Sequence, residues 1–112
     1  MAVLTVQTVN RSGLAPTYAA ASGGGDKFSP DDRTFLHVKN GSGGALTVTI
    51  VTPKTTSFGA AISDIAVSVP AAGERMIGPF PRQHFADTDD GLADITYSGV
   101  TSLTIAAVEL AS

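Results

Sequence analysis

Cysteine and tryptophan are absent from this 112-residue chain, and charged side chains make up only 15% of it. The lack of cysteine excludes disulfides, thiolate zinc sites and cysteine nucleophiles. Only two Glu and three Lys are present, and because solvated helices usually display these residues, we do not expect helix to dominate. No apolar run approaches the ~20 residues of a membrane span, so no membrane partner is expected. The first residues have no basic region ahead of an apolar stretch, so we expect no signal peptide.

The net charge is −3, which argues against a general nucleic-acid binder, because such proteins carry a basic excess on one face. The length is typical of a single domain with one hydrophobic core. Length, charge and composition therefore predict a single-domain protein made inside a cell, and they do not indicate its function.

Alternation of apolar and polar residues is the clearest signal that the chain does contain. The segment 45–53 places Leu46, Val48 and Ile50 on one face, which predicts a half-buried strand. The segment 33–40 alternates in the same way, and the glycines of 40–44 supply a tight reversal between the two. We therefore predict a β-hairpin over 33–52.

Further strands are predicted at 65–70, 74–80, 92–98 and 103–110, separated by turns rich in Gly and Pro. The last of them is apolar on both faces, which is typical of a central or covered strand. The fold class that these strands predict is all-β, a small antiparallel β-sandwich, either jelly-roll-like or a small barrel, with an extended N-terminal arm. One residue set is expected to face a common core: Leu46, Val48, Ile50, Ile65, Val67, Ile95, Leu103 and Ile105.

Residues 1–32 differ from the β-sandwich domain expected at 33–112. The run Gly23-Gly24-Gly25 marks a flexible hinge or a close backbone approach. Two interpretations stay open: an edge strand and loop packed on the same sandwich, or an arm that docks on neighbouring subunits. The interaction residues expected on such an arm are Val3, Leu4, Val6, Val9, Leu14 and Tyr18.

Candidate sites for chemistry are weak. The run Asp87-Thr-Asp-Asp-Gly91 contains three carboxylates, but it lacks the ligand spacing of a calcium loop. Asp and Gly favour turns, so we predict a turn here, and a bound cation stays an alternative. His37 and His84 have no nucleophile signature around them. We therefore expect no catalytic residue, no metal, no cofactor and no enzymatic activity. Phe and Tyr side chains near short loops leave a carbohydrate- or ligand-binding β-module as an alternative.

Several segments resemble those of small β-rich virion proteins encoded in the head-gene clusters of tailed phages. The resemblance covers nearly the whole chain, without a single diagnostic motif, and rests on residues 13–28, 33–44, 46–53, 69–81 and 94–110.

This resemblance implies a capsid decoration protein, a β-sandwich that binds the outside of the shell, often as a trimer, and stabilises it. The implied partners are the major capsid protein and copies of the chain itself. The implied location is the capsid exterior of the virion, after synthesis in the host cytoplasm. A head–tail connector or tail component has the same composition and stays an alternative. No catalytic residues come with the family.

Overall fold

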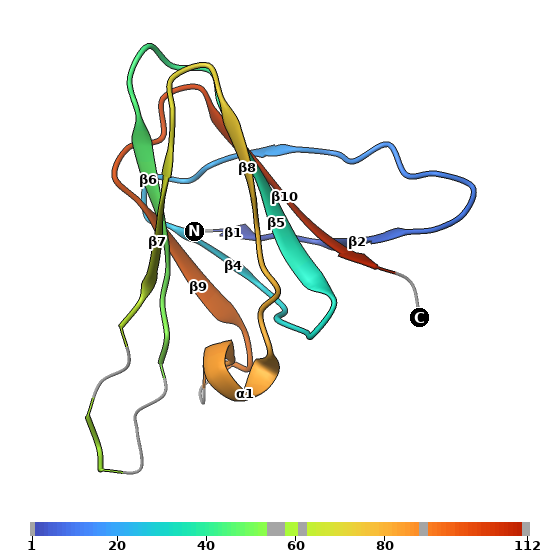
Figure 1. Cartoon of the computed structure of the whole chain (residues 1–112), viewed down its shortest axis with the longest axis vertical. Helices are drawn as coiled ribbons and strands as arrows, with labels where there is room; N and C mark the ends of the chain where they lie inside the picture. Colours follow the sequence, from blue (N-terminus) through green and yellow to red (C-terminus); the bar gives the residue numbers. More distant parts are fainter. Residues whose placement is uncertain (1, 54–57, 61–62, 88–89, 111–112) are drawn as a thin grey trace.

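The computed structural model of the chain describes residues 2–53, 58–60, 63–87 and 90–110. Strands account for 44% of the chain and helix for 4%. The strands form two sheets packed face to face (Figure 1). The predicted all-β sandwich is confirmed, and the two sheets do not close into a barrel.

The first sheet contains, in spatial order, β1 (Ala2–Val3), β4 (Asp26–Phe28), β9 (Ala93–Tyr97), β6 (Leu46–Ile50) and β7 (Ile65–Val69). The second sheet contains β2 (Val6–Val9), β10 (Leu103–Leu110), β5 (Thr34–Asn40) and β8 (Glu74–Ile77), and β3 (Ala19–Ala20) pairs with β10. A single helical turn, α1 (Arg82–Phe85), precedes β9. β1 pairs with β4, and β2 with β10, in parallel; the other pairings are antiparallel.

The core lies between the sheets, where the apolar faces of the strands meet. Of the residues expected there, Leu46 and Val67 are partly buried, and the following are almost fully buried: Val48, Ile50, Ile95, Leu103 and Ile105. Ile65 is the exception, because 36% of its surface is exposed. It is the first residue of β7, an edge strand, so its assignment to the interior was wrong. Aromatic rings complete the core, with Phe80 in edge-to-face contact with Phe28 and Phe85.

The predicted hairpin over 33–52 is wrong. β5 pairs with β8 and β10 in the second sheet, whereas β6 pairs with β7 and β9 in the first. The chain does reverse at the glycines, but it crosses to the other sheet. This crossing lets the apolar face of β5 and the apolar face of β6 meet across the core, which pairing within one sheet would not achieve.

Two other tight connections, β7 to β8 and β9 to β10, also cross between the sheets (Figure 1). The three turns are hydrogen-bonded to one another: Gly41 N–H donates to Ser102 O (2.9 Å), and Ala72 N–H donates to Ser42 O (3.3 Å). The buried Asn40 side chain donates to Gly44 O at 2.9 Å and to Val69 O at 3.1 Å. These bonds satisfy polar groups that the crossing turns bury.

β10 is central, as its two apolar faces predicted, because it lies between β5 and the strands β2 and β3. Its inner face carries Leu103, Ile105 and Ala107, which belong to the core. On its outer face Ala106 and Val108 are also buried. A strand covered on both faces gains from apolar residues at every position.

The strands of the N-terminal segment belong to the same sandwich as the rest of the chain, and docking of this segment on a neighbouring subunit stays a prediction. β1, β2 and β3 pair with strands of the same sandwich, and between β2 and β3 the chain projects away from the sheets (Figure 1). Of the three glycines, Gly25 makes the close backbone approach: its φ is +94°, and an added Cβ would lie 2.5 Å from Ile95 O. Gly23 and Gly24 have no such neighbour within 4 Å.

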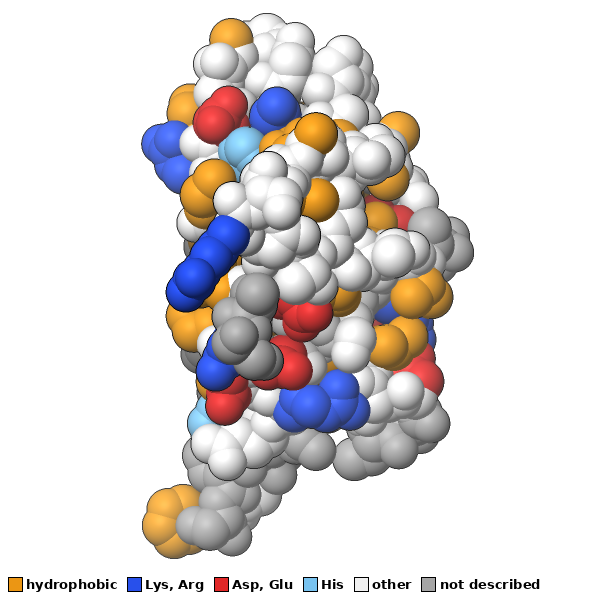
Figure 2. Space-filling model, turned by 90° about the vertical axis from the view of Figure 1, so that its right-hand side faces the viewer, with side chains coloured by type: hydrophobic (Ala, Val, Ile, Leu, Met, Phe, Trp, Pro, Cys, Tyr) orange, Lys and Arg blue, Asp and Glu red, His pale blue; other side chains and the backbone are white. Residues whose placement is uncertain are grey.

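Charges of both signs lie among hydrophobic side chains on the face seen in Figure 2, and neither sign gathers into a continuous patch there. Within the described ranges, no helix is both long enough and apolar enough to cross a membrane.

Candidate functional site

The residues expected to form an interaction surface lie near an open pocket at one edge of the sandwich. The pocket has a volume of about 380 Å³. It is lined by Val3, Leu4, Thr5, Gln7, Thr17, Tyr18, Ala19, Ile105, Ala106 and Ala107. The structure therefore brings together three of the six expected residues, Val3, Leu4 and Tyr18; the lining does not include Val6, Val9 and Leu14.

A change of partner along β10 creates this pocket. β3 pairs with β10 at Thr104 and Ile105, whereas β2 takes over from Ala107 onward. At Ala106 the two partners diverge, because β3 runs antiparallel to β10 and β2 runs parallel to it. Leu4 and Ile105 line the gap between them and also belong to the hydrophobic core.

The six expected residues differ in exposure. Val3 is 63% exposed at the rim, whereas Leu4 is only 7% exposed and belongs to the core. Leu4 therefore has little surface to offer a partner. Val6 is partly buried against the core, and the remaining residues are half-buried: Val9, Leu14 and Tyr18.

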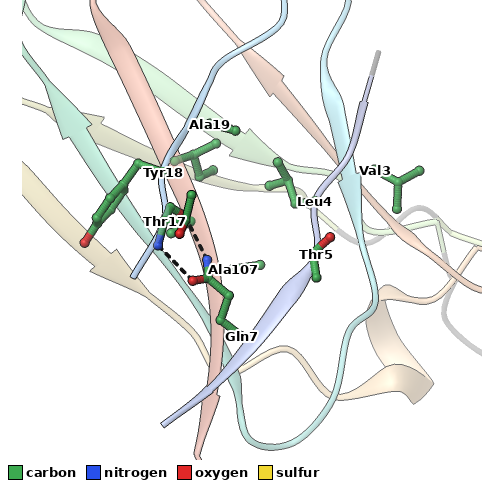
Figure 3. Close-up of a pocket in the computed structure, with 10 residues that line it drawn as sticks. Val3, Leu4, Thr5, Gln7, Thr17, Tyr18, Ala19 and Ala107 are labelled. Atoms are coloured by element: carbon green, nitrogen blue, oxygen red, sulfur yellow. Dashed lines mark hydrogen bonds between the residues drawn. The ribbon is translucent and has the colours of Figure 1, made fainter. Parts of the chain in front are cut away.

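The Gln7 side chain forms two hydrogen bonds across the pocket to Thr17, in the segment that leads into β3. Its Nε2 donates to Thr17 O at 2.8 Å, and its Oε1 accepts from Thr17 N–H at 2.8 Å, as Figure 3 shows. Both ends of the amide are therefore engaged. None of the described residues that line the pocket is charged, and its exposed surface is mostly apolar.

Tyr18, His37 and Glu74 form a hydrogen-bonded series on the outer face of the second sheet. The Tyr18 hydroxyl lies 2.5 Å from His37 Nδ1, and His37 Nε2 lies 3.0 Å from Glu74 Oε1. The Lys39 ammonium sits 4.2 Å from the centre of the Tyr18 ring. A hydroxyl, an imidazole and a carboxylate in this order resemble a nucleophile, its base and an orienting group. Here the series links Tyr18, the residue before β3, to β5 and β8, which anchors the returning N-terminal chain.

No sequence pattern indicated this series, because Tyr18 lies 19 residues from His37 and His37 lies 37 residues from Glu74. His84 lies in α1, where it is exposed and its Nε2 is 3.1 Å from Gln83 Nε2.

The acidic run 87–91 is only partly described, and its Asp89 lies outside the described residues. Asp90 pairs with the Lys27 ammonium at 2.6 Å, and Asp94 lies 3.5 Å from the same nitrogen. The hydrogen bond to Lys27 lowers the pKa of Asp90, and the hydrogen bond to Asp90 raises the pKa of Lys27. In the described part of the chain, no group of three or more His, Asp or Glu residues has the arrangement of a metal site.

Asp26 is a fully buried carboxylate that no sequence pattern indicated. Its Oδ2 accepts from the Tyr97 hydroxyl at 2.7 Å and from Ser22 N–H at 3.2 Å. Burial, with a contribution from Asp26, raises the pKa of Tyr97 well above its ordinary value. This pair holds the glycine turn against β9, which is a structural role.

Comparisons with protein-family models, with curated proteins and with solved structures find no match to this chain.

Proposed function

We propose that this chain is a structural protein of a tailed-phage virion, which binds the outer surface of the capsid together with copies of itself and stabilises the shell. The proposal rests on the resemblance of its segments to small virion proteins and on one structural observation. That observation is an apolar patch on the outer face of the second sheet, which we call the outer patch and define as Phe35, Met76 and Leu110.

Strand register supports the outer patch. Met76 lies opposite His37, and Phe35 lies opposite Val108, two residues before Leu110. All of these side chains point away from the core, because their neighbours Leu36 and Ile77 point into it. Met76 is 68% exposed and Leu110 is 55% exposed. Phe35 is a diagonal neighbour of Met76 on this face and lines a shared pocket with Leu110, and Glu74 and Lys39 lie on the same face. Large apolar side chains that are exposed close together and bordered by polar residues are typical of an interaction site.

A modest contact per copy is sufficient for this role. Burial of apolar surface contributes about 25 cal/mol per Å², and much of that gain is offset by the cost of association. On a shell, copies that also contact one another bind with avidity, so weak individual contacts give stable decoration. The major capsid protein is the partner that this proposal implies.

The main alternative from a different class, a carbohydrate- or ligand-binding module, has less support. A sugar site needs free hydrogen-bond donors and acceptors beside an aromatic ring. In the pocket both ends of the Gln7 amide bond Thr17, and the Tyr18 hydroxyl bonds His37. Tyr18, the aromatic residue that lines the pocket, therefore already uses its hydroxyl in a hydrogen bond within the chain.

The test is co-sedimentation of the purified chain with capsids that were assembled without it. We expect saturable binding and a higher melting temperature of the decorated capsid. Met76→Asp is expected to weaken binding at least tenfold, because it would bury a charge in the contact. Thr101→Asp, at an exposed position in the β9–β10 turn, adds the same charge and is expected to bind normally. No co-sedimentation of the wild-type chain, or equal loss in both variants, would refute the proposal.

A further inference from the structure

The first sheet ends in an edge strand that lacks the usual protection. β7 is the last strand of that sheet, so among the described residues no strand lies beyond it. Proteins protect such edges with charged side chains, proline, bulges or very short strands. The five residues of β7 include no charged residue and no proline, and they pair with β6 without a bulge. By contrast, β8 at an edge of the second sheet carries Glu74 and Arg75.

The free edge of β7 presents the backbone groups of Ala66 and Ser68. In β6, Thr47 faces β9, because Ser98 N–H donates to Thr47 O at 2.9 Å and Thr47 N–H donates to Ser98 Oγ at 2.8 Å. Opposite residues of an antiparallel pair either both face each other or both face away. Ser68 lies opposite Thr47, and Ala66 lies opposite Thr49, so the N–H and C=O groups of both point away from β6. Both residues are exposed, which leaves these groups accessible to a further strand.

This edge is complementary to itself. A second copy can pair antiparallel to β7 about a two-fold axis at Val67, which places Ala66 of each copy opposite Ser68 of the other. Their outward N–H and C=O groups would then bond one another, so that each finds a partner. Asp64, the acidic residue just before β7, would lie opposite Pro70, so no like charges meet.

The same pairing would cover Ile65, a large hydrophobic residue of which 36% is exposed. Ile65, Val67 and Val69 share the inner face of β7, because they lie opposite residues of β6 that pack in or against the core. In the two-fold register, Ile65 lies opposite Val69 of the second copy, so the apolar face continues from one molecule to the next. A second copy therefore satisfies the backbone and the side chains together. A strand from another protein would do so only if it had the same uncharged pattern.

We infer that β7 is the contact between two copies of this chain, which join edge to edge so that their first sheets form one continuous sheet. Such a contact uses the same surface on both copies, so it closes into a dimer. This contact deepens the proposed function, on which its setting in the virion rests, because it is a means by which copies associate on the shell. Whether it forms is tested with the protein in solution.

The first experiment uses the absence of cysteine from the chain. Val67→Cys places one thiol of each copy at the two-fold axis. There the Cα atoms of a pair without mutual hydrogen bonds lie about 4.5 Å apart, within the span of a disulfide. Ser68→Cys is the matched control, since its thiol is more exposed but lies beside Ala66 of the second copy. On mild oxidation we expect Val67→Cys to form linked dimers at least about tenfold faster than Ser68→Cys, whereas random collision would give the reverse order.

Sedimentation equilibrium over a wide concentration range measures association directly. We expect the wild-type chain to show a monomer–dimer equilibrium. Ala66→Pro removes an N–H that faces the second copy and leaves the bonds to β6 in place, at a position where edge strands tolerate proline. It should weaken dimerisation at least about tenfold. Ala66→Val keeps the N–H and should dimerise like the wild type, and thermal melts of each variant establish that it is folded.

A charge-swapped pair of variants tests the same contact without proline. One chain carries Ala66→Lys with Ser68→Lys, and the other carries Ala66→Glu with Ser68→Glu. Each variant would meet its own copy with like charges directly opposite, so each alone should stay monomeric. A mixture of the two brings opposite charges together and should form a one-to-one dimer.

Three results would overturn the inference: a wild-type chain that stays monomeric, a Val67→Cys variant that cross-links no faster than Ser68→Cys, or a charge-swapped mixture that remains monomeric. An edge that accepts only a strand of another protein would give the first of these. The proposed function is judged separately. A monomeric Ala66→Pro variant that still co-sediments with capsids supports that function, and a wild-type chain that dimerises without binding capsids refutes that function alone.

Discussion

Individual polar residues join parts of this sandwich that are distant in the sequence. Tyr97 and Asp26 are 71 residues apart, and their hydrogen bond links β9 to β4. Such a bond contributes modestly when made, but leaving one partner buried and unpaired costs more. Because Asp26 has no exposed surface, the loss of one of its hydrogen-bond donors should destabilise the fold.

Tyr97→Phe keeps the ring and removes the hydroxyl. We expect it to lower the free energy of unfolding by about 1–3 kcal/mol at neutral pH, because Asp26 loses a donor. Chemical denaturation followed by circular dichroism measures this loss. Thr96→Val, which removes a hydroxyl at the exposed neighbouring position of β9, serves as a control for substitution in the same strand.

The same variant should change the alkaline response. Burial raises the pKa of Tyr97 above its ordinary value of 10.0. The neutral hydroxyl thus stabilises the fold fully below pH 10, and this contribution is lost as the pH rises above 10, where the unfolded chain ionises first. The difference between Tyr97→Phe and the wild type should therefore shrink above pH 10. A constant difference up to pH 11 would contradict this assignment.

Alanine substitutions can distinguish the predicted core residues that are buried from Ile65, which is not. Ile50→Ala and Ile95→Ala should each cost about 2–5 kcal/mol, since both side chains are enclosed. Ile65→Ala should cost about 1 kcal/mol or less, because its side chain stays partly in water. Urea denaturation of the three variants gives the comparison. An equal loss at all three positions would show that Ile65 is buried after all.

At the element scale, the sequence located most strands but not their partners. Alternation identified β5, β6, β7 and β9 because it depends only on neighbouring residues. The turn signal at 40–44 established that the chain reverses, yet it carried no information on which sheet receives the next strand. The short β1, β3 and β4 have too few residues to alternate. Their positions depend on pairing: β1 with β4, β4 with β9, and β3 with β10.

The glycine turn before β4 offers a test of the close approach. Gly25→Ala combines a φ of +94° with a Cβ placed 2.5 Å from Ile95 O, so we expect a loss of at least about 2 kcal/mol. Gly24→Ala meets nothing within 4 Å and should change stability by less than about 0.5 kcal/mol. Thermal melting of both proteins provides the measurement. Equal stability of the two would favour a flexible hinge over a fixed turn.

At the scale of the whole molecule, the pocket is the feature that no local pattern predicts. Its lining joins Val3, Tyr18 and Ala106, which are brought together only when β2 and β3 both reach β10. The apolar residues of the N-terminal segment did indicate an unusual surface. The sequence does not show which of those residues are buried in the core and which are exposed at the rim of the pocket, because their burial depends on long-range strand pairing.

The N-terminal segment should therefore be required for folding as well as for contacts. Deletion of residues 2–22 removes β1, β2 and β3, together with Leu4 and Ala21 of the core. The edge of β10 would then lose its partners along most of its length, and its inner face would open to water. We expect this deletion to abolish the cooperative thermal transition, as recorded by circular dichroism and by the dispersion of amide signals in NMR spectra.

A shorter truncation is the matched control. Removal of residues 2–3 alone deletes β1 but keeps Leu4 and the pairing of β2 with β10. That protein should remain folded with a melting temperature only a few degrees lower, since about 1 kcal/mol corresponds to roughly 4–8 °C in a domain of this size. A cooperative transition near the wild-type temperature after deletion of residues 2–22 would instead identify the segment as a dispensable arm. Its apolar residues would then be available, in the intact chain, for contacts with neighbouring subunits.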